Sequence, residues 1–535
     1  MNADAFVRAG RREWVGLGVI ALPCLLYSMD LTVLDLAVPR ISADLQPTSA
    51  QLLWIMDIYG FVLASCLIPM GTLGDRIGRR RLLLIGAASF GVASVIAAFS
   101  KSAGMLIAAR AALGVAGATL APSTLSLIRN MFTDPKQRTF AIGVWITSYS
   151  AGGVIGPLLG GVLLNHFWWG SVFLIGVPVM VLLLVLGPVL LPEFRDPNPR
   201  RIDLHSVLLS LAAVLLVIYG IKQIAQGVTS WWPTLSIASG LVIGVVFIRR
   251  QQTLADPLID LKLFRIRTFS TALAAYALGT FVLFGFFLFT TQYLQLVLGF
   301  SPLRAGLWML PTFGAFIAGS LLTPLVSRRI HRAQLLSAGL VVSAIGFWIV
   351  AGIGVTSGLV ALVTGSTIYA LGLSPVFTLT TDTIVSAAPP ERAGVASALS
   401  ETGSELGGAL GIAILGSIGT AIYRTGLAHS APHGISVGAS NAASSTLGAA
   451  IAVAQRLPAS VGTHLTGAAR EAFIQSLDMT ALICAVVALA TAIALAILLR
   501  ERPSPRRVAS RHADPLGRVA AFLIAANKVR SNTAG

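Results

Sequence analysis

Residues 71–81 read Gly-Thr-Leu-Gly-Asp-Arg-Ile-Gly-Arg-Arg-Arg and join two apolar runs, near 52–73 and 81–99. An apolar run of about 20 residues is long enough to cross a bilayer as a helix. The glycines allow a tight turn between two such helices. We therefore expect an inner turn whose acid and arginines latch against neighbouring helix ends in one conformation, and a plain basic turn is the alternative. The predicted latch residues are Gly71, Gly74, Asp75, Arg76, Gly78 and Arg79.

The composition of the whole chain is that of a membrane protein. Of its 535 residues, 55% are hydrophobic and 11% are charged, and the mean hydropathy is +0.83. Soluble domains carry about 25% charged residues. The net charge of +17 comes from short basic clusters between apolar runs, which argues against a nucleic-acid-binding face. Cys24, Cys66 and Cys484 lie singly in apolar runs, so neither a metal site nor a disulfide is predicted.

Fourteen apolar runs are long enough to be membrane spans, although the eighth is the shortest. They lie near 14–38, 52–73, 81–99, 103–129, 139–165, 168–191, 204–224, 234–249, 269–298, 303–326, 334–353, 356–382, 392–423 and 475–499. Lysine and arginine alternate between rich and poor loops, as expected if the rich loops are cytoplasmic. The predicted outer loops carry only Arg40, Lys101, Lys222, Arg304, Arg424, Arg456 and Arg470. Both termini are therefore predicted to be cytoplasmic.

A weak internal repeat divides the chain into halves. Ala112-Leu113-Gly114 and Ala370-Leu371-Gly372 head corresponding runs. We predict an all-α membrane protein with a six-helix bundle in 1–195, two linker helices in 196–266, a second six-helix bundle in 267–500 and a basic tail in 501–535. A long extracellular loop is expected near 424–474, with a short helix near 444–456. Internal repeats place a transporter's substrate site at their interface.

A few charged residues lie inside the predicted spans, where each costs about 3 kcal/mol on insertion. They are Asp30, Asp35, Asp57, Arg110, Asp382, Glu401 and Glu405. Such residues mark transport or proton pathways by default. Asp382 lies at the inner end of its span, where a helix-end role is favoured.

Asp30 lies in the middle of the first span, without a basic neighbour within a turn. A buried carboxyl that exchanges a proton near neutral pH suits proton coupling, and a structural hydrogen-bonded acid is the alternative. Arg110 is expected to offset a carboxylate. Glu401 and Glu405 share one helix face because they are four residues apart, so one could take the proton and the other a cation.

Aromatic residues near these acids suit a lipophilic cation, because a carboxylate can pair with its charge and a ring can bind it through cation–π contact. Asp57 lies between Trp54 and Tyr59, although an interfacial position is the alternative. Asp35 is expected at the mouth of the cavity. The candidate lining comprises Trp54, Tyr59, Trp145, Tyr149, Phe284, Phe287, Trp308 and Phe313.

The fifth predicted span contains Gly-Gly-Val-Ile-Gly-Pro-Leu-Leu-Gly-Gly at 152–161. Small residues every three or four positions let helices approach closely, and proline removes a backbone hydrogen bond. This pattern predicts a packing and hinge element. Its residues are Gly152, Gly156, Pro157, Gly160 and Gly161.

These motifs together resemble the major facilitator superfamily. Residues 71–81 resemble its signature loop, Arg110 with Gly114 and Gly117 its fourth-helix motif, and 152–161 its antiporter motif. Met29-Asp30-Leu31-Thr32-Val33 resembles the first-helix motif of the fourteen-span drug:proton antiporters, the multidrug exporters of the QacA, SmvA and LfrA kind. The resemblance implies proton coupling by Asp30 and Glu405 and cation recognition by Asp57 and Glu401. Asp35 departs from the family pattern.

The predicted function is proton-coupled export of lipophilic cationic drugs, dyes and antiseptics across the bacterial inner membrane. Export of a neutral or anionic amphiphile on the same fold is the alternative. We expect no cofactor besides the proton gradient, no metal, no nucleic-acid partner and a monomer in the bilayer. An enzyme is disfavoured because 1–535 contains no G-x-S-x-G, H-E-x-x-H or P-loop motif.

Overall fold

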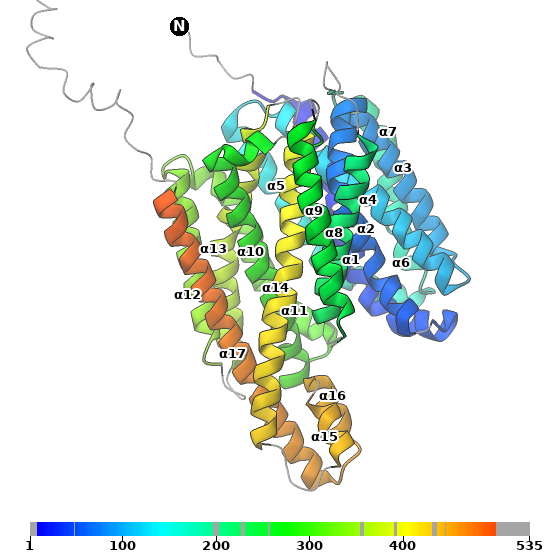
Figure 1. The fold of residues 1–535 in the computed structure, drawn as a ribbon, viewed down its shortest axis with the longest axis vertical. Coiled ribbons are helices and arrows are strands. Elements are labelled where there is room, and N and C mark those ends of the chain that lie inside the picture. The colour runs from blue at the N-terminus through cyan, green and yellow to red at the C-terminus, as the bar shows by residue number, and fades with distance from the viewer. Residues whose placement is uncertain are drawn as a thin grey trace, which may run out of the picture.

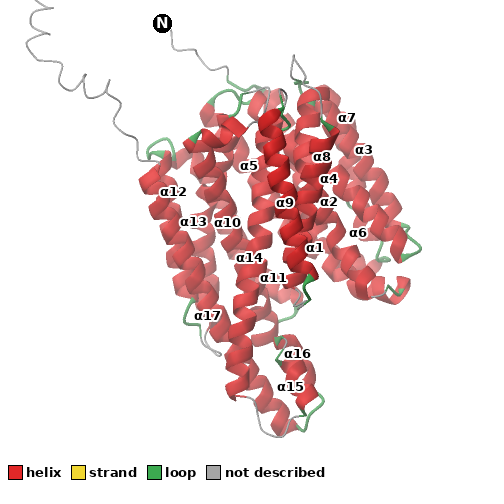
Figure 2. Cartoon of the chain, in the orientation of Figure 1, coloured by secondary structure: helices red, strands yellow, loops and turns green. Residues whose placement is uncertain are grey.

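The computed structural model describes residues 8–47, 49–195, 203–225, 230–254, 257–259, 261–353, 358–389, 393–430, 436–444 and 446–498. These residues fold into helices and connecting turns, and no strand occurs among them (Figure 2). The predicted all-α membrane fold is thus confirmed. The predicted tail 501–535 lies outside the described residues.

The first bundle contains six membrane-length elements, one of which is broken into α6 and α7. Its helices are α1 (Arg11–Leu45), α2 (Ser49–Ile77), α3 (Arg79–Ala98), α4 (Ala103–Met131), α5 (Pro135–His166), α6 (Ser171–Leu174) and α7 (Gly176–Leu190). Two further helices, α8 (Leu204–Ala225) and α9 (Trp232–Thr253), pack as a pair. They lie between the bundles, and α8 contacts α2 and α14 (Figure 1).

The second bundle is built from α10 to α14 and α17. Its elements are η1 (Leu261–Arg265), α10 (Arg267–Gln292), η2 (Tyr293–Val297), α11 (Pro302–Val326), α12 (Arg332–Val350), α13 (Gly358–Ala387), α14 (Ala393–Ser430), α15 (Val437–Ala443), α16 (Leu447–Ala454) and α17 (Ala459–Leu498). The bundles meet where α2 packs against α14 and α5 packs against α11. The candidate site lies along this interface.

Thirteen helices of the described chain are long and apolar enough to cross a membrane. The 32-residue α5 is not among them, but it packs along α1 within the first bundle. The eighth run, predicted as the shortest, is the 22-residue α9.

The segment predicted as a loop at 424–474 is largely helical where the structure describes it. α14 continues to Ser430 and α17 begins at Ala459, with α15 and α16 between them (Figure 1). Alanine-rich sequence favours helix, and Ser436 and Thr446 cap α15 and α16 by accepting hydrogen bonds from backbone N–H groups. The short helix expected near 444–456 corresponds to α16.

α1 begins and α17 ends at the same end of the bundles (Figure 1). We call this the inner end, because the sequence predicts that both termini are cytoplasmic. The turn between α2 and α3, the end of α13 and the start of α14 all lie there. The opposite end, which carries α15 and α16, is called the outer end.

Candidate functional site

Asp30 of α1 and Arg110 of α4 form a buried ion pair. Arg110 Nη1 lies 2.7 Å from Asp30 Oδ2, and the two side chains are 2% and 11% exposed, respectively. Arg110 also donates to the backbone oxygens of Ile55 and Met56 at 3.1 and 3.3 Å, and its guanidinium lies 4.9 Å from the centre of the Tyr59 ring. The positive charge of Arg110 therefore balances the negative charge of the Asp30 carboxylate, as predicted for this arginine.

Glu401 and Glu405 lie on α14 at the interface between the bundles. The Tyr27 hydroxyl of α1 donates to Glu405 Oε1 at 2.9 Å, so this bond joins the two bundles. Glu401 is 5% exposed, and its Oε1 has no hydrogen-bond partner among the described residues. The two acids on one helix face therefore have different surroundings.

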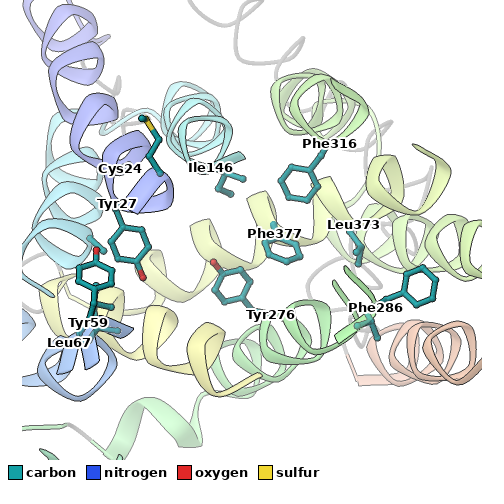
Figure 3. Close-up of a cluster of buried hydrophobic side chains, with 14 of the residues drawn as sticks. Cys24, Tyr27, Tyr59, Leu67, Ile146, Tyr276, Phe286, Phe316, Leu373 and Phe377 are labelled. Carbon is teal, nitrogen blue, oxygen red and sulfur yellow. The ribbon is translucent and has the colours of Figure 1, made fainter. Parts of the chain in front are cut away.

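Aromatic side chains from both bundles surround Glu401. The rings of Tyr27 and Tyr149 lie 5.2 Å apart, and Trp145 lies 4.7 Å from Tyr149. Tyr27 and Tyr276 point toward each other from opposite bundles (Figure 3). Glu401 lies within electrostatic range of Tyr27, Tyr149 and Tyr276. We call Tyr27, Tyr59, Trp145, Tyr149 and Tyr276 the aromatic cluster.

Two hydroxyl groups of the aromatic cluster are buried without partners. Within the described chain, neither the Tyr59 nor the Tyr149 hydroxyl has a hydrogen bond. Buried polar groups are normally paired, so these two hydroxyls and Glu401 Oε1 are each able to bind a polar or charged partner. Sequence reasoning missed Tyr27 and Tyr276, although Tyr27 precedes Asp30 by three residues and so shares its helix face.

Other predicted lining residues lie away from this cluster. Trp54 is 40% exposed and stacks on Tyr219 of α8, with ring centres 6.2 Å apart. Phe284 and Trp308 are 47% and 39% exposed, whereas Phe287 and Phe313 pair between α10 and α11. The side chains of Asp35 and Asp57 lie outside the described residues.

The predicted latch connects α2 to the start of α14. Asp75 accepts hydrogen bonds from the backbone N–H groups of Gly394 and Val395 at 3.1 and 3.2 Å, and from Arg79 Nε at 3.0 Å. A carboxylate is favoured at a helix N-terminus by its free N–H groups and dipole. Asp75 therefore holds the two bundles together at the inner end.

The glycines of this stretch permit the latch. A Cβ on Gly71 would lie 2.6 Å from the Gly394 backbone oxygen, so only glycine allows α2 and α14 to approach so closely. Gly78 has a φ of 110° between α2 and α3, and Gly74 packs near Leu82. Arg76 is exposed.

Asp382 forms a second connection at the inner end, where a helix-end role was predicted. Its side chain is fully buried and lies 2.8 Å from Arg138 Nε of α5 and 2.8 Å from Arg332 Nη1 of α12. The Thr139 hydroxyl donates to Asp382 Oδ2 at 3.1 Å, the oxygen that also pairs with Arg332. Since Arg138 and Thr139 belong to the first bundle, Asp382 at the end of α13 bridges the two bundles.

The predicted hinge residues lie in α5, which is continuous through Pro157. A Cβ on Gly152 would lie 2.9 Å from the Ser28 Cβ, so this glycine permits close packing of α5 on α1. Gly156 and Gly160 are buried, whereas Gly161 has open space beside it. The side chain of Pro157 lies outside the described residues.

Comparisons with known proteins agree with this architecture. The model of the Major Facilitator Superfamily matches residues 20–412. The chain is 44% identical to the multidrug efflux pump LfrA of Mycolicibacterium smegmatis, over 92% of this chain and 98% of LfrA. It is 37% identical to the methyl viologen resistance protein SmvA of Salmonella typhimurium, over 87% of this chain and 94% of SmvA.

Solved structures share the fold at low sequence identity. A bacterial homologue of the human lysosomal transporter Spinster, in an inward-facing and unoccupied conformation, matches with a TM-score of 0.57 and 20% identity, over 93% of this chain and 100% of that one. The human organic anion transporter MFSD10 also gives a TM-score of 0.57, with 14% identity over 89% of this chain and 99% of that one. This chain is a multi-pass inner-membrane protein and a transporter rather than an enzyme, and it belongs to the major facilitator superfamily.

Proposed function

We propose that this protein exports lipophilic cationic drugs, dyes and antiseptics in exchange for protons, by alternating access. Two relatives named for multidrug efflux and methyl viologen resistance, which match nearly their whole length, support drug export. In this proposal the chain crosses the membrane fourteen times as a monomer, with both termini in the cytoplasm and only the proton gradient as energy source. Thirteen candidate spans together with α5 support that number.

The observation that carries the proposal is the unpaired carboxyl of Glu401. An ionised carboxylate buried without a partner is strongly disfavoured, by several kcal/mol. The group is stable either with a proton or with a cation beside it, and the two alternatives exclude each other. A proton and a cationic substrate can therefore compete at one carboxyl, which is the requirement for antiport.

The aromatic cluster supports a lipophilic cation as the substrate. Tyrosine and tryptophan faces attract cations, by up to about 2 kcal/mol when desolvated. Tyr27, Tyr149 and Tyr276 surround Glu401 from both bundles, so a bound cation would contact both halves of the transporter. Asp57 and Asp35 remain proposed contributors at the outer side.

Asp30, Arg110 and Glu405 are the proposed proton-coupling residues. If Asp30 gained a proton, Arg110 would lose its charged partner at 2.7 Å. Arg110 also holds backbone oxygens of α2, and Tyr27 on α1 holds Glu405 of α14. Protonation would thus be transmitted from α1 to α2 and to the second bundle.

The two connections at the inner end support alternating access. Asp75 and Asp382 join the bundles there, as a state closed on the inner side would require. Both connections would have to release before a cytoplasmic substrate could enter. The glycines of α5 would permit the accompanying movement against α1.

Export of a neutral or anionic amphiphile is the second candidate. The tetracenomycin C resistance and export protein of Streptomyces glaucescens is 34% identical over 76% of each chain, so relatives are not limited to one named compound. The carboxylates at the interface would repel an anion, but they would not repel a neutral molecule. Screening of substrates separates these two candidates.

The test uses inverted membrane vesicles energised with a proton gradient and the fluorescent cation ethidium. The wild type should accumulate ethidium, and an uncoupler should abolish that accumulation. Glu401→Gln and Asp30→Asn should each reduce the rate at least tenfold. Asp478→Asn is the matched control, because Asp478 accepts a bond from Gly352 within the second bundle.

Each failure has a distinct meaning. If the wild type moves no cation under any gradient, the substrate class is wrong and neutral compounds should be screened. If Glu401→Gln transports at the wild-type rate, competition at this carboxyl is refuted. If only Asp30→Asn is unaffected, Asp30 is excluded as a proton-coupling residue and Glu405 is the remaining carboxyl for that role.

A further inference from the structure

A groove at the inner end of α8 and α9 has no part in the proposed transport cycle. It has a volume of about 510 Å³ and is lined by His205, Leu208, Leu209, Val246, Arg249, Arg250 and Thr253. α8 begins and α9 ends at the inner end (Figure 1). The groove therefore lies at the level of the proposed cytoplasmic membrane surface, far from Glu401 in the centre.

One arginine of the groove, Arg250, forms an ion pair with Asp203. Arg250 Nε donates to Asp203 Oδ2 at 2.6 Å, and the Ser206 hydroxyl donates to the same oxygen at 2.8 Å. Hydrogen bonds from Arg250 and Ser206 hold the pKa of Asp203 well below its usual range. The pair therefore stays ionised and fixes α9 to the start of α8.

The neighbouring Arg249 is exposed, and no hydrogen bond or ion pair connects it to another part of the described chain. A guanidinium binds phosphate oxygens through two parallel N–H groups. Arg249 thus supplies the groove with an available cation suited to phosphate. His205, whose side chain is 81% exposed, lies on the same rim.

The other wall of the groove is apolar. Leu208 and Val246 are 63% and 48% exposed. The exposed apolar surface continues along α9 towards the outer end, through Val245, Val242 and Leu241. In a chain that crosses a membrane, such a surface contacts acyl chains. The groove thus offers a cation at the surface and an apolar wall below it.

We propose that this groove binds an anionic phospholipid of the inner leaflet, with Arg249 on its phosphate and Leu208 and Val246 along an acyl chain. The cytoplasmic leaflet is rich in anionic lipids, and each nearby arginine contributes to their attraction. The lipid would brace the α8–α9 pair, of which α8 packs against α2 and α14. Headgroup charge and acyl chain are both required for recognition.

The test is native mass spectrometry of the delipidated full-length protein, titrated with phosphatidylglycerol or phosphatidylcholine. The wild type should bind its first phosphatidylglycerol more tightly than phosphatidylcholine. Arg249→Gln should weaken phosphatidylglycerol binding about fivefold, and Leu208→Asn should weaken both lipids. Arg329→Gln is the matched control, because Arg329 is an exposed inner-end arginine outside the groove.

Two results would overturn the proposal. Equal weakening by Arg249→Gln and Arg329→Gln would mean that general positive charge, and not this groove, attracts the lipid. Complete displacement of phosphatidylglycerol by millimolar inorganic phosphate would mean that the site takes a free anion. Both variants should keep the elution volume and helix content of the wild type, because Arg249 and Arg329 are exposed.

Discussion

Replacing Asp382 by asparagine is expected to open the inner end of the transporter. Asp382 is fully buried between Arg138 of the first bundle and Arg332 of the second, at 2.8 Å from each. Asparagine keeps the shape of the side chain but leaves Arg138, which is 9% exposed, without a charged partner. Only the state closed on the inner side loses this interaction, since both arginines can reach water when the bundles separate.

The expected size of the effect follows from burial. Removing one partner of a buried ion pair costs about 3–5 kcal/mol, but Arg332 is 43% exposed and its share is screened. We therefore expect the closed state to lose about 2–4 kcal/mol, which shifts the ratio of open to closed molecules by roughly 30- to 1,000-fold. Arg138→Gln should act similarly, and Arg332→Gln should act less.

The assay is thiol labelling of a cysteine placed at Ser397 in a chain whose three native cysteines are replaced by alanine. Ser397 is fully buried at the interface, with its hydroxyl 3.5 Å from that of Ser126. A membrane-impermeant maleimide applied from the cytoplasmic side should label this cysteine slowly. Labelling should accelerate at least tenfold with Asp382→Asn and stay unchanged with Asp478→Asn. Unchanged labelling in Asp382→Asn would refute the reasoning.

Two further predictions address the packing of the inner end and the link between the bundles. Gly71→Ala should also accelerate labelling at Ser397→Cys, because its Cβ would lie 2.6 Å from the Gly394 oxygen. Gly104→Ala in α4, whose Cβ would have no atom within 4 Å, is the control, and equal effects of the two substitutions would contradict this. Tyr27→Phe removes the hydroxyl bound to Glu405, an interaction of about 1.5–3 kcal/mol, and should slow proton-driven ethidium uptake about tenfold or more. Tyr369→Phe, buried but distant from the acids, should transport normally; a wild-type rate in Tyr27→Phe would exclude the link.

The sequence was sufficient to predict an all-α membrane protein, because a membrane helix is specified by local hydropathy, but the largely helical segment at 424–474 was predicted as a loop. The spacing of Glu401 and Glu405 likewise placed both acids on one helix face, and the structure places that face at the bundle interface. The turn at 71–81 was predicted to act as a latch because its acid and glycines are adjacent in sequence. Each of these inferences depends on neighbours within a few turns of one helix.

The partners of the charged residues required the structure. Asp30 and Arg110 are 80 residues apart, and Asp382 and Arg138 are 244 apart. Arg138 and Arg332 belong to the lysine- and arginine-rich loops that the sequence identifies only as cytoplasmic, since a basic residue at the end of a span is explained by topology alone. Trp54 was assigned to the cavity because it is close to Asp57 in sequence, but its ring faces α8. Neither pairing nor ring direction follows from a local pattern.

The different surroundings of the acids suggest how a proton could be exchanged for a cation without leakage. Asp30 has Arg110 and Glu405 has Tyr27, whereas Glu401 has a buried carboxyl oxygen, Oε1, without a partner among the described residues. A cation at Glu401 would replace a proton there, while Asp30 and Glu405 could change their protonation only by weakening bonds that connect α1 to α4 and α14. Substrate binding and movement would thus depend on different carboxyl groups. Such a division predicts that losing Glu401 abolishes recognition, whereas losing Asp30 uncouples movement from the proton.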